Sequence, residues 1–347
     1  MNEEILEYAI KKTCELLAID SPTGYTGNAE RFVLQTFSEE LGFPTTHTVK
    51  GGVLIDFGGP ASDEGALLLA AHADTLGAMV CEIKSDGRMH VTKLGGLNAN
   101  NVEAENCRVI TKFSGEYEGT LQLANASIHV NPEYDKTERT FDSIELVLDE
   151  TVYTKEDVKD LGIDVGDIVC LDPRTRITTS GYIKSRFLDD KLSVGILMGL
   201  GKAIRDGLVK PTRRLYGYVT VYEEVGHGAS GSIPQDVREV ISVDMGCIGE
   251  GLQCTEQQVS ICAKDTFGPY AYETTKALIE AAKRAEVDYA VDVYPRYGSD
   301  VEDALTSGYD IRHGLIGPGV YASHGYERSH KDGVMNTLKL LEAYISR

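Results

Sequence analysis

Two adjacent glutamates, Glu223 and Glu224, are the residues that most directly suggest chemistry in this sequence. They follow an alternating apolar run at 215–221, which predicts a buried strand, and a Gly-rich loop is predicted after them at 226–231. Neighbouring residues on an extended backbone point to opposite sides, so one carboxylate can bind a metal ion while the other faces a substrate. This division suits a hydrolase. An isolated Glu-Glu pair is more often a solvated strand end, so the interpretation depends on the rest of the chain.

A second polar pair, His72 and Asp74, follows another apolar run. Residues 66–71 are uninterrupted apolar residues, which is typical of a strand covered on both faces of a sheet. Polar groups at the end of such a strand open into the crevice where α/β folds bind their ligands. A single histidine there is more often structural, so this pair also counts only in combination.

Further acids and one late histidine complete the candidates. Asp189 stands at the start of a predicted helix, where a favourable N-terminal charge is the simpler explanation for its neighbour Asp190. Asp244 follows a predicted strand at 237–243, and strand ends of this kind converge on one edge of a sheet. The complete set is His72, Asp74, Asp189, Glu223, Glu224, Asp244 and His324.

This set contains imidazoles and carboxylates but no thiolate, which suits Zn, Co or Mn rather than a structural thiolate zinc site. Five ligands with one bridging carboxylate would hold two ions close together, as two-metal hydrolases do to polarise a carbonyl and generate hydroxide at neutral pH. A general base cannot be fully occupied as a ligand, and the doubled glutamate meets that need.

The elements that position these residues follow two patterns. Helical and strand patterns alternate over residues 1–75 and 181–347, with helices predicted at 3–19, 29–41 and 270–285, and this predicts an α/β domain. Residues 76–180 carry short alternating stretches broken by Gly, Asn and Asp, with one helix predicted at 154–160. We therefore expect a β-rich domain inserted into an α/β catalytic domain.

Composition excludes several classes of function. The 347 residues carry a formal net charge of −20, from 54 acids and 34 bases, which argues against nucleic acid as a partner. No apolar run is long enough to cross a bilayer, and the acidic first residues do not resemble a signal peptide, so we expect a cytoplasmic protein without a membrane partner. Seven scattered cysteines without a Cys-x-x-Cys pair predict reduced thiols.

The order of the motifs resembles one known family. His72-x-Asp74 is followed by Leu-Asp-Asp-Lys at 188–191, Glu-Glu-Val-Gly at 223–226, Val-Asp-Met-Gly at 243–246 and the late His324. This order is similar to that of the glutamyl/leucyl aminopeptidases, which include the deblocking aminopeptidases and the tetrahedral TET peptidases. The likeness covers nearly the whole chain, because residues 159–169 of the insertion also match the family's pattern.

The resemblance implies a di-zinc exopeptidase-like fold, with a mixed central sheet flanked by helices. It implies two divalent ions, Zn or Co, and peptide substrates with a free N-terminus. It also implies that the insertion helps to build a homo-oligomer, with a dodecamer as one candidate. Residue by residue, it implies His72 as ligand of one ion, Asp189 as the bridge, Glu224 and Asp244 as further ligands, His324 completing the second site, Glu223 as general base and Asp74 orienting His72.

The sequence departs from the family pattern at two places. Thr75 stands where many members have an acid, which leaves the preferred substrate open. The segment 323–330 reads Ser-His-Gly-Tyr-Glu-Arg-Ser-His, whereas the family more often has His-Ser-Pro-x-Glu, so His330 is a rival to His324. We prefer His324 because it lies between the Gly-Pro-Gly stretch at 317–319 and the last helix. His227 has no place in the pattern.

Three alternatives remain. A di-metal deacylase or carboxypeptidase could use the same ligand types, and Asp300 in a predicted loop at 298–300 hints at an amine-binding acid. A catalytically silent binding or assembly protein would have lost the base or a ligand, and the sequence shows no such loss. A glucanase is disfavoured because the chain has no Trp for a sugar-binding platform.

Overall fold

The computed structural model describes residues 1–346, which form two compact units. The first comprises Met1–Asp74 and the chain from Arg174 onward, and the second comprises Thr75–Pro173. The second unit ends before residue 180, the boundary that the sequence pattern indicates. Residues 176–177 belong to the first unit because strand β10 (Arg176–Ile177) pairs with β11 (Tyr182–Ser185).

The first unit is built on a 12-stranded mixed sheet whose main order is β1-β2-β12-β3-β13-β17-β18-β11-β10. Three of the central strands, β12, β3 and β13, run parallel, and β17 continues parallel to β13. Besides β10 and β11, the strands are β1 (Thr45–His47), β2 (Val53–Gly58), β3 (Ala66–His72), β12 (Leu215–Thr220), β13 (Val237–Val243), β14 (Gly246–Ile248), β15 (Val259–Lys264), β16 (Tyr289–Val293), β17 (Arg312–Tyr321) and β18 (Glu327–His330).

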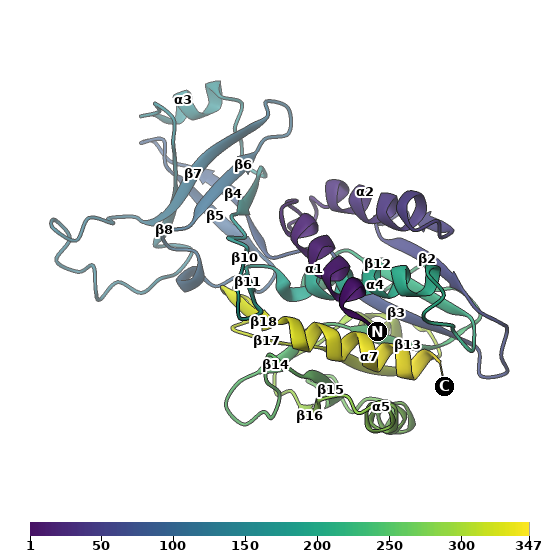
Figure 1. The fold of residues 1–347 in the computed structure, drawn as a ribbon. Coiled ribbons are helices and arrows are strands. Elements are labelled where there is room, and N and C mark those ends of the chain that lie inside the picture. The colour runs from purple at the N-terminus through teal and green to yellow at the C-terminus, as the bar shows by residue number, and fades with distance from the viewer. Residues whose placement is uncertain (347) are drawn as a thin grey trace. The chain divides into compact units, whose positions relative to one another are not determined.

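Helices flank this sheet (Figure 1), which confirms the predicted fold class. They are α1 (Glu3–Leu17), α2 (Gly27–Gln35), α4 (Leu188–Arg205), α5 (Tyr272–Arg284), α6 (Asp300–Thr306) and α7 (Lys331–Ile345), with a π-helical turn η1 (Thr36–Glu40) and a 3₁₀ turn η3 (Glu223–Val225). Within residues 1–346 no helix is long and apolar enough to cross a membrane.

Strand β3 lies at the centre of the core, and all its residues are buried. Successive side chains of a strand point to opposite faces, and they join two separate apolar clusters here. Leu67, Leu69 and Ala71 pack in the cluster that contains α1, α4 and α7. Leu68 and Ala70 pack with Val301 and Ala304 of α6. The apolar run is therefore uninterrupted because both faces of the sheet are covered.

The second unit is a closed antiparallel barrel with strand order β4-β5-β8-β7-β6-β9. Closure leaves no unpaired sheet edge. This agrees with the β-rich character predicted for the insertion. The elements are β4 (Gly77–Ile83), β5 (Met89–Leu94), η2 (Ala99–Asn101), β6 (Asn106–Ile110), β7 (Glu116–Leu123), β8 (Ile144–Leu148), α3 (Lys155–Asp160) and β9 (Ile168–Leu171).

One local prediction was wrong. Asp300 was expected in a loop, but it begins α6, which Ser299 and Glu302 start with a capping box. The Gly-Pro-Gly stretch at 317–319 lies inside β17, which pairs with β15 on one side. Gly317 is required there, because a Cβ at this position would lie 1.7 Å from the carbonyl oxygen of Asp244.

A buried ion pair holds the far end of the sheet together. Glu239 of β13 is 2% exposed and accepts hydrogen bonds from Arg213, from Thr274 of α5 (2.8 Å) and from Tyr344 of α7 (3.0 Å). Burial raises the pKa of Glu239, but the Arg213 charge and these hydrogen bonds outweigh it and hold the pKa below its usual 4.5. Through these hydrogen bonds, the Glu239 carboxylate links α5 and α7 to β13.

We expect Glu239→Gln to destabilise the first unit by about 3–5 kcal/mol, because it leaves the buried Arg213 guanidinium with only the exposed Glu64 carboxylate, at 3.9 Å, as a counter-charge. The measurement is urea unfolding at neutral pH. The control is Glu273→Gln, which removes an exposed pair with Lys276 and should change stability by less than about 1 kcal/mol. The wild type should also lose this contribution as the pH falls below 4.5, because the carboxylate must then be protonated. Equal effects of the two variants would contradict the assignment.

Candidate metal centre

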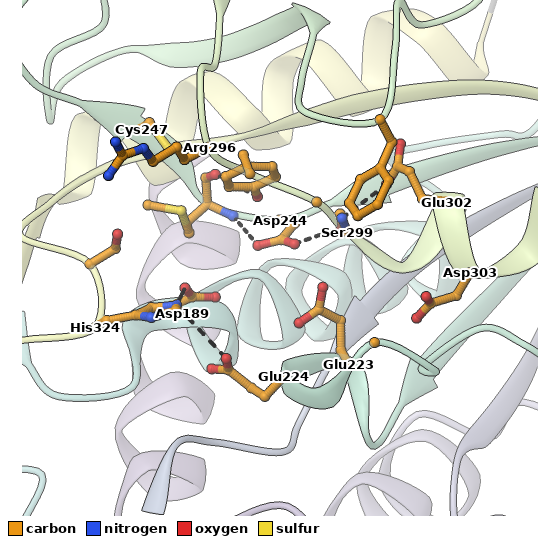
Figure 2. A pocket seen from close by; sticks show the side chains of 16 residues that line it. Asp189, Glu223, Glu224, Asp244, Cys247, Arg296, Ser299, Glu302, Asp303 and His324 are labelled. Carbon is orange, nitrogen blue, oxygen red and sulfur yellow. Dashed lines mark hydrogen bonds and ion pairs between the residues drawn. The ribbon is translucent and has the colours of Figure 1, made fainter. Parts of the chain in front are cut away.

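The predicted site residues come together at one edge of the sheet, and Asp189, Glu223, Glu224, Asp244 and His324 line a cavity of about 410 Å³ there (Figure 2). His72 is the last residue of β3, Glu223 and Glu224 follow β12, and Asp244 follows β13. These strands are parallel neighbours in the order β12-β3-β13, so their carboxyl ends meet. Asp189 comes from the start of α4, and His324 from the turn between β17 and β18.

His72 is buried, and its two ring nitrogens face different groups. Nε2 lies 3.2 Å from Oδ1 of Asp189 and 3.5 Å from Oε2 of Glu223. Nδ1 lies 2.9 Å from the carbonyl oxygen of Asp74 and 3.6 Å from its carboxylate. The backbone of Asp74 is thus the closer partner of the ring, and the contact leaves Nε2 directed at the carboxylates.

The Asp74 carboxylate instead holds the doubled glutamate. It accepts hydrogen bonds from the backbone N–H groups of Glu223 (3.1 Å) and Glu224 (3.4 Å) and from the Thr23 hydroxyl (2.6 Å). The two N–H groups belong to the first residues of η3, whose N-terminal N–H groups have no partner within the turn. Asp74 therefore fixes the segment that carries both glutamates.

The prediction that Glu223 and Glu224 lie on an extended backbone was wrong. Tyr222 takes a left-handed conformation with φ of 71°, and Glu223–Val225 form the 3₁₀ turn. The turn still separates the two side chains. Figure 2 shows Glu224 reaching toward Asp189 and His324, with Glu223 standing apart from it. Oε2 of Glu224 lies 3.8 Å from Nε2 of His324.

Two groups of side chains offer donor atoms that lie within 4.8 Å of one another: His72 with Asp189 and Glu224, and His72 with Asp190 and Asp244. Asp190 was not among the predicted ligands. It is fully buried, and its Oδ1 has no hydrogen-bond partner in the described part of the chain. The Asp-Asp doublet was the available signal, but a charge at a helix N-terminus explained it equally well.

In the described part of the chain, the carboxylates have imidazole partners but no Lys or Arg partner. Among residues 1–346, no Lys or Arg side chain forms an ion pair with Asp189, Glu223, Glu224 or Asp244. Burial and neighbouring negative charges raise the pKa of Glu223 and of Glu224 well above the usual range. Burial and the charge of Asp189 raise the pKa of Asp244 to about 6. Divalent cations fit this donor set, because they supply the positive charge that the protein lacks here.

The rival histidines lie elsewhere. His330 caps α7, accepting from the N–H of Asp332 (3.1 Å) through Nδ1, and its Nε2 lies 2.8 Å from the carbonyl oxygen of Ser180. His227 stacks on Tyr222 with ring centroids 5.0 Å apart. Only His324, of these three, lines the cavity. Its Nε2 lies 3.5 Å from Oδ2 of Asp189.

Asp300, the acid that the sequence suggested for amine binding, is not among the residues that line the cavity. Asp300 is buried behind the cavity wall and accepts from the Thr220 hydroxyl at 2.7 Å. The acids that line the cavity from α6 are Glu302 and Asp303. Phe267 and Arg296 also line it, and no sequence pattern indicated them because they come from separate loops.

Comparisons with known proteins agree with this site. The M42 glutamyl aminopeptidase family matches residues 51–340. The chain is 42% identical to "Putative aminopeptidase YhfE" of Bacillus subtilis over 97% of this chain and 98% of that protein. A TET aminopeptidase from a marine sediment Thaumarchaeota archaeon has the same fold, with a TM-score of 0.88, 17% identity, and coverage of 98% of this chain and 96% of that one.

The TET1 peptidase of Pyrococcus horikoshii, which can assemble into a tetrahedron or a large octahedral shell, superposes with a TM-score of 0.84 at 20% identity, covering 97% of this chain and 99% of that one. The family resemblance inferred from the motifs is confirmed. The chain belongs to the M42 glutamyl aminopeptidase family and is a metallo-aminopeptidase, a hydrolase that acts on peptide bonds.

Proposed function

We propose that the cavity holds two divalent metal ions, Zn or Co, and removes the N-terminal residue of peptides that carry a free amino group. The observation that carries this proposal is the buried group of carboxylates and imidazoles, which has no Lys or Arg partner among residues 1–346. The cost of burying several like charges is large unless cations neutralise them. Acids from two strand ends and one helix start, together with His72 at the end of the strand between them, therefore support a two-ion site.

Asp189 is the proposed bridging ligand. Its Oδ1 faces Nε2 of His72 at 3.2 Å, and its Oδ2 faces Nε2 of His324 at 3.5 Å, so the two oxygens serve two different imidazoles. His72 and Asp244 would hold one ion, and Glu224 and His324 the other, which agrees with their contacts. Asp190 stands beside His72 and Asp244 and adds a further carboxylate.

The ions, when bound, would polarise the scissile carbonyl and lower the pKa of water. Glu223 is the proposed general base. Its carboxylate lines the cavity next to the ligands, and Asp74 fixes its backbone. In this role Glu223 accepts a proton from the attacking water and returns it to the leaving amino group. Asp74 acts by positioning the glutamates and the His72 ring.

Assembly and location complete the proposal. We propose that the chain forms a homo-oligomer, to which the second unit contributes, by analogy with the shells formed by the P. horikoshii protein. A dodecamer is one such assembly. A cytoplasmic location is also proposed, and the cysteines, all of which are free thiols, support it.

Chelation should abolish activity on free-amino peptides, and Zn, Co or Mn should restore it. The ions should also raise the unfolding midpoint, because they bind the native state and not the unfolded chain. The measurement is hydrolysis before and after metal add-back, with N-acetylated versions of the same peptides as the control. Full activity in metal-free protein would contradict the proposal. Cleavage of the acetylated peptides would favour the deacylase or carboxypeptidase alternatives.

Glu223→Gln should keep the metal and lower turnover by roughly a hundred- to ten-thousand-fold, because the amide cannot accept the proton. Glu224→Gln should lose metal first and activity with it, because a charged ligand is removed. Metal stoichiometry and turnover of both variants separate the two roles. If Glu223→Gln loses metal while Glu224→Gln retains it, the roles are reversed.

Replacing residues 75–173 with a short linker should leave a folded first unit that no longer assembles. The first unit has its own sheet and apolar core, so its fold should survive the replacement. Size-exclusion chromatography with light scattering measures the assembly, and circular dichroism measures the fold. If the truncated protein has the same number of subunits as the full chain, assembly does not require the barrel.

A further inference from the structure

A row of basic side chains crosses the outer face of the first unit's sheet. Arg176 of β10 lies directly opposite Lys184 of β11, and Lys184 lies directly opposite Arg328 of β18. The three side chains therefore share one face of three adjacent strands. Ile183 and Ser329, which alternate with them, are fully buried on the other face.

This row opens into a basic cleft of about 700 Å³, lined by Arg174, Thr175, Arg176, Lys184 and Tyr326. All five residues belong to the first unit. The Arg174 guanidinium stacks on the Tyr326 ring at 4.3 Å, and the Tyr326 hydroxyl donates to the carbonyl oxygen of Arg174 at 2.9 Å. These contacts fix one wall of the cleft. No acidic residue of the described range 1–346 lines it.

The cations are incompletely neutralised. Arg328 pairs with Glu256 at 3.0 Å, but neither Arg176 nor Lys184 has an ion-pair partner among residues 1–346. Like charges directly opposite on neighbouring strands destabilise a sheet. A protein with a net charge of −20 offers many acids, yet none lies in ion-pair distance of these two side chains. An anion from outside would relieve this repulsion.

The adjacent backbone favours an extended ligand. Strand β10 is the last strand in the sheet order, so one of its backbone edges is unpaired, and Ile177 within it is 49% exposed. An edge strand can pair with an added peptide strand, while side chains beside it select the sequence. An extended peptide with acidic residues satisfies both the open edge and the cations.

One turn borders both this cleft and the catalytic cavity. Ser323 and His324 line the cavity, and Tyr326 lines the cleft. Consecutive Cα atoms are about 3.8 Å apart, so the Cα atoms of His324 and Tyr326 are separated by at most about 7.6 Å. Glu327, the next residue, accepts from the N–H groups of Asp189 and His324, both at 3.0 Å. Glu327 alternates with Arg328 along β18, so it lies on the face opposite to the basic row. A peptide that leaves the catalytic cavity would therefore pass around this turn to reach the cleft.

We propose that the basic cleft is an accessory substrate site that binds acidic residues of a peptide downstream of its scissile bond. The enzyme then favours peptides whose later residues are acidic, independently of the N-terminal residue. This inference rests on the proposed aminopeptidase function, because it assigns the cleft to the same substrates. Contacts of this kind are electrostatic, so the preference weakens as salt screens them.

The test is the double variant Arg176→Gln/Lys184→Gln. Two series of peptides share the same N-terminal residue. In the acidic series a Glu-Glu pair is moved stepwise from position 3 to position 8, and the neutral series carries Gln-Gln at the same positions. We expect a five- to tenfold lower KM for the acidic peptides at one or two positions in the wild type, and about equal KM values in the variant. The kcat should stay unchanged, and so should hydrolysis of a single-residue chromogenic amide.

Lys276→Gln/Lys283→Gln is the matched control, because it removes the same charge from exposed positions on α5 and should leave the preference intact. Fluorescence anisotropy with an N-acetylated acidic peptide measures binding without turnover, so the cleft can be tested even if the proposed activity fails. Equal KM values for acidic and neutral peptides in the wild type would overturn the proposal. A variant that changes its oligomeric size but keeps the preference would also overturn it, and would assign the cleft to a second copy of the chain.

Discussion

Several carboxylates brought into one cavity, with no Lys or Arg partner in the described part of the chain, are the constraint on which this structure depends. Asp189, Glu223, Glu224 and Asp244 would repel one another in the interior, and the two imidazoles that face them cannot neutralise all of them. The parallel order β12-β3-β13 forces three of these acids to one edge, and divalent cations, which fit this donor set, would offset their repulsion. Catalytic capacity and metal dependence are thus consequences of the same crowding.

Contacts from distant parts of the chain hold this edge in place. The turn after α1 supplies the Ser21 hydroxyl to the carbonyl oxygen of Ala73 and the Thr23 hydroxyl to Asp74, at 2.7 and 2.6 Å. The buried Lys191 of α4 donates to the carbonyl oxygens of Leu16 (3.1 Å) and Ile19 (2.6 Å) near the end of α1. The first helix therefore supports both the His-x-Asp segment and the helix that carries Asp189, although it contributes no ligand.

Much of the fold and of the site could be predicted because their signals are local. An apolar run ending in His72 predicts a central strand whose end is polar, and β3 has this form. Acids at the ends of two further apolar runs predict the same sheet edge, where Glu223, Glu224 and Asp244 lie. The types of the side chains alone restrict the chemistry to hard or borderline divalent ions. The change to short alternating stretches likewise marked the inserted barrel.

The remaining features depend on partners far away in the sequence. Glu223 begins a 3₁₀ turn because Asp74, 149 residues earlier, accepts its N–H. Gly317–Gly319 continue a strand because β15 pairs beside them. His324 and His330 differ in what each imidazole contacts: His330 caps a helix, and His324 faces Asp189. The sequence by itself determined which residue types stand at the strand ends, because burial periodicity is a local property. Only the tertiary structure decided which of them face one another, because that depends on contacts that no local pattern contains.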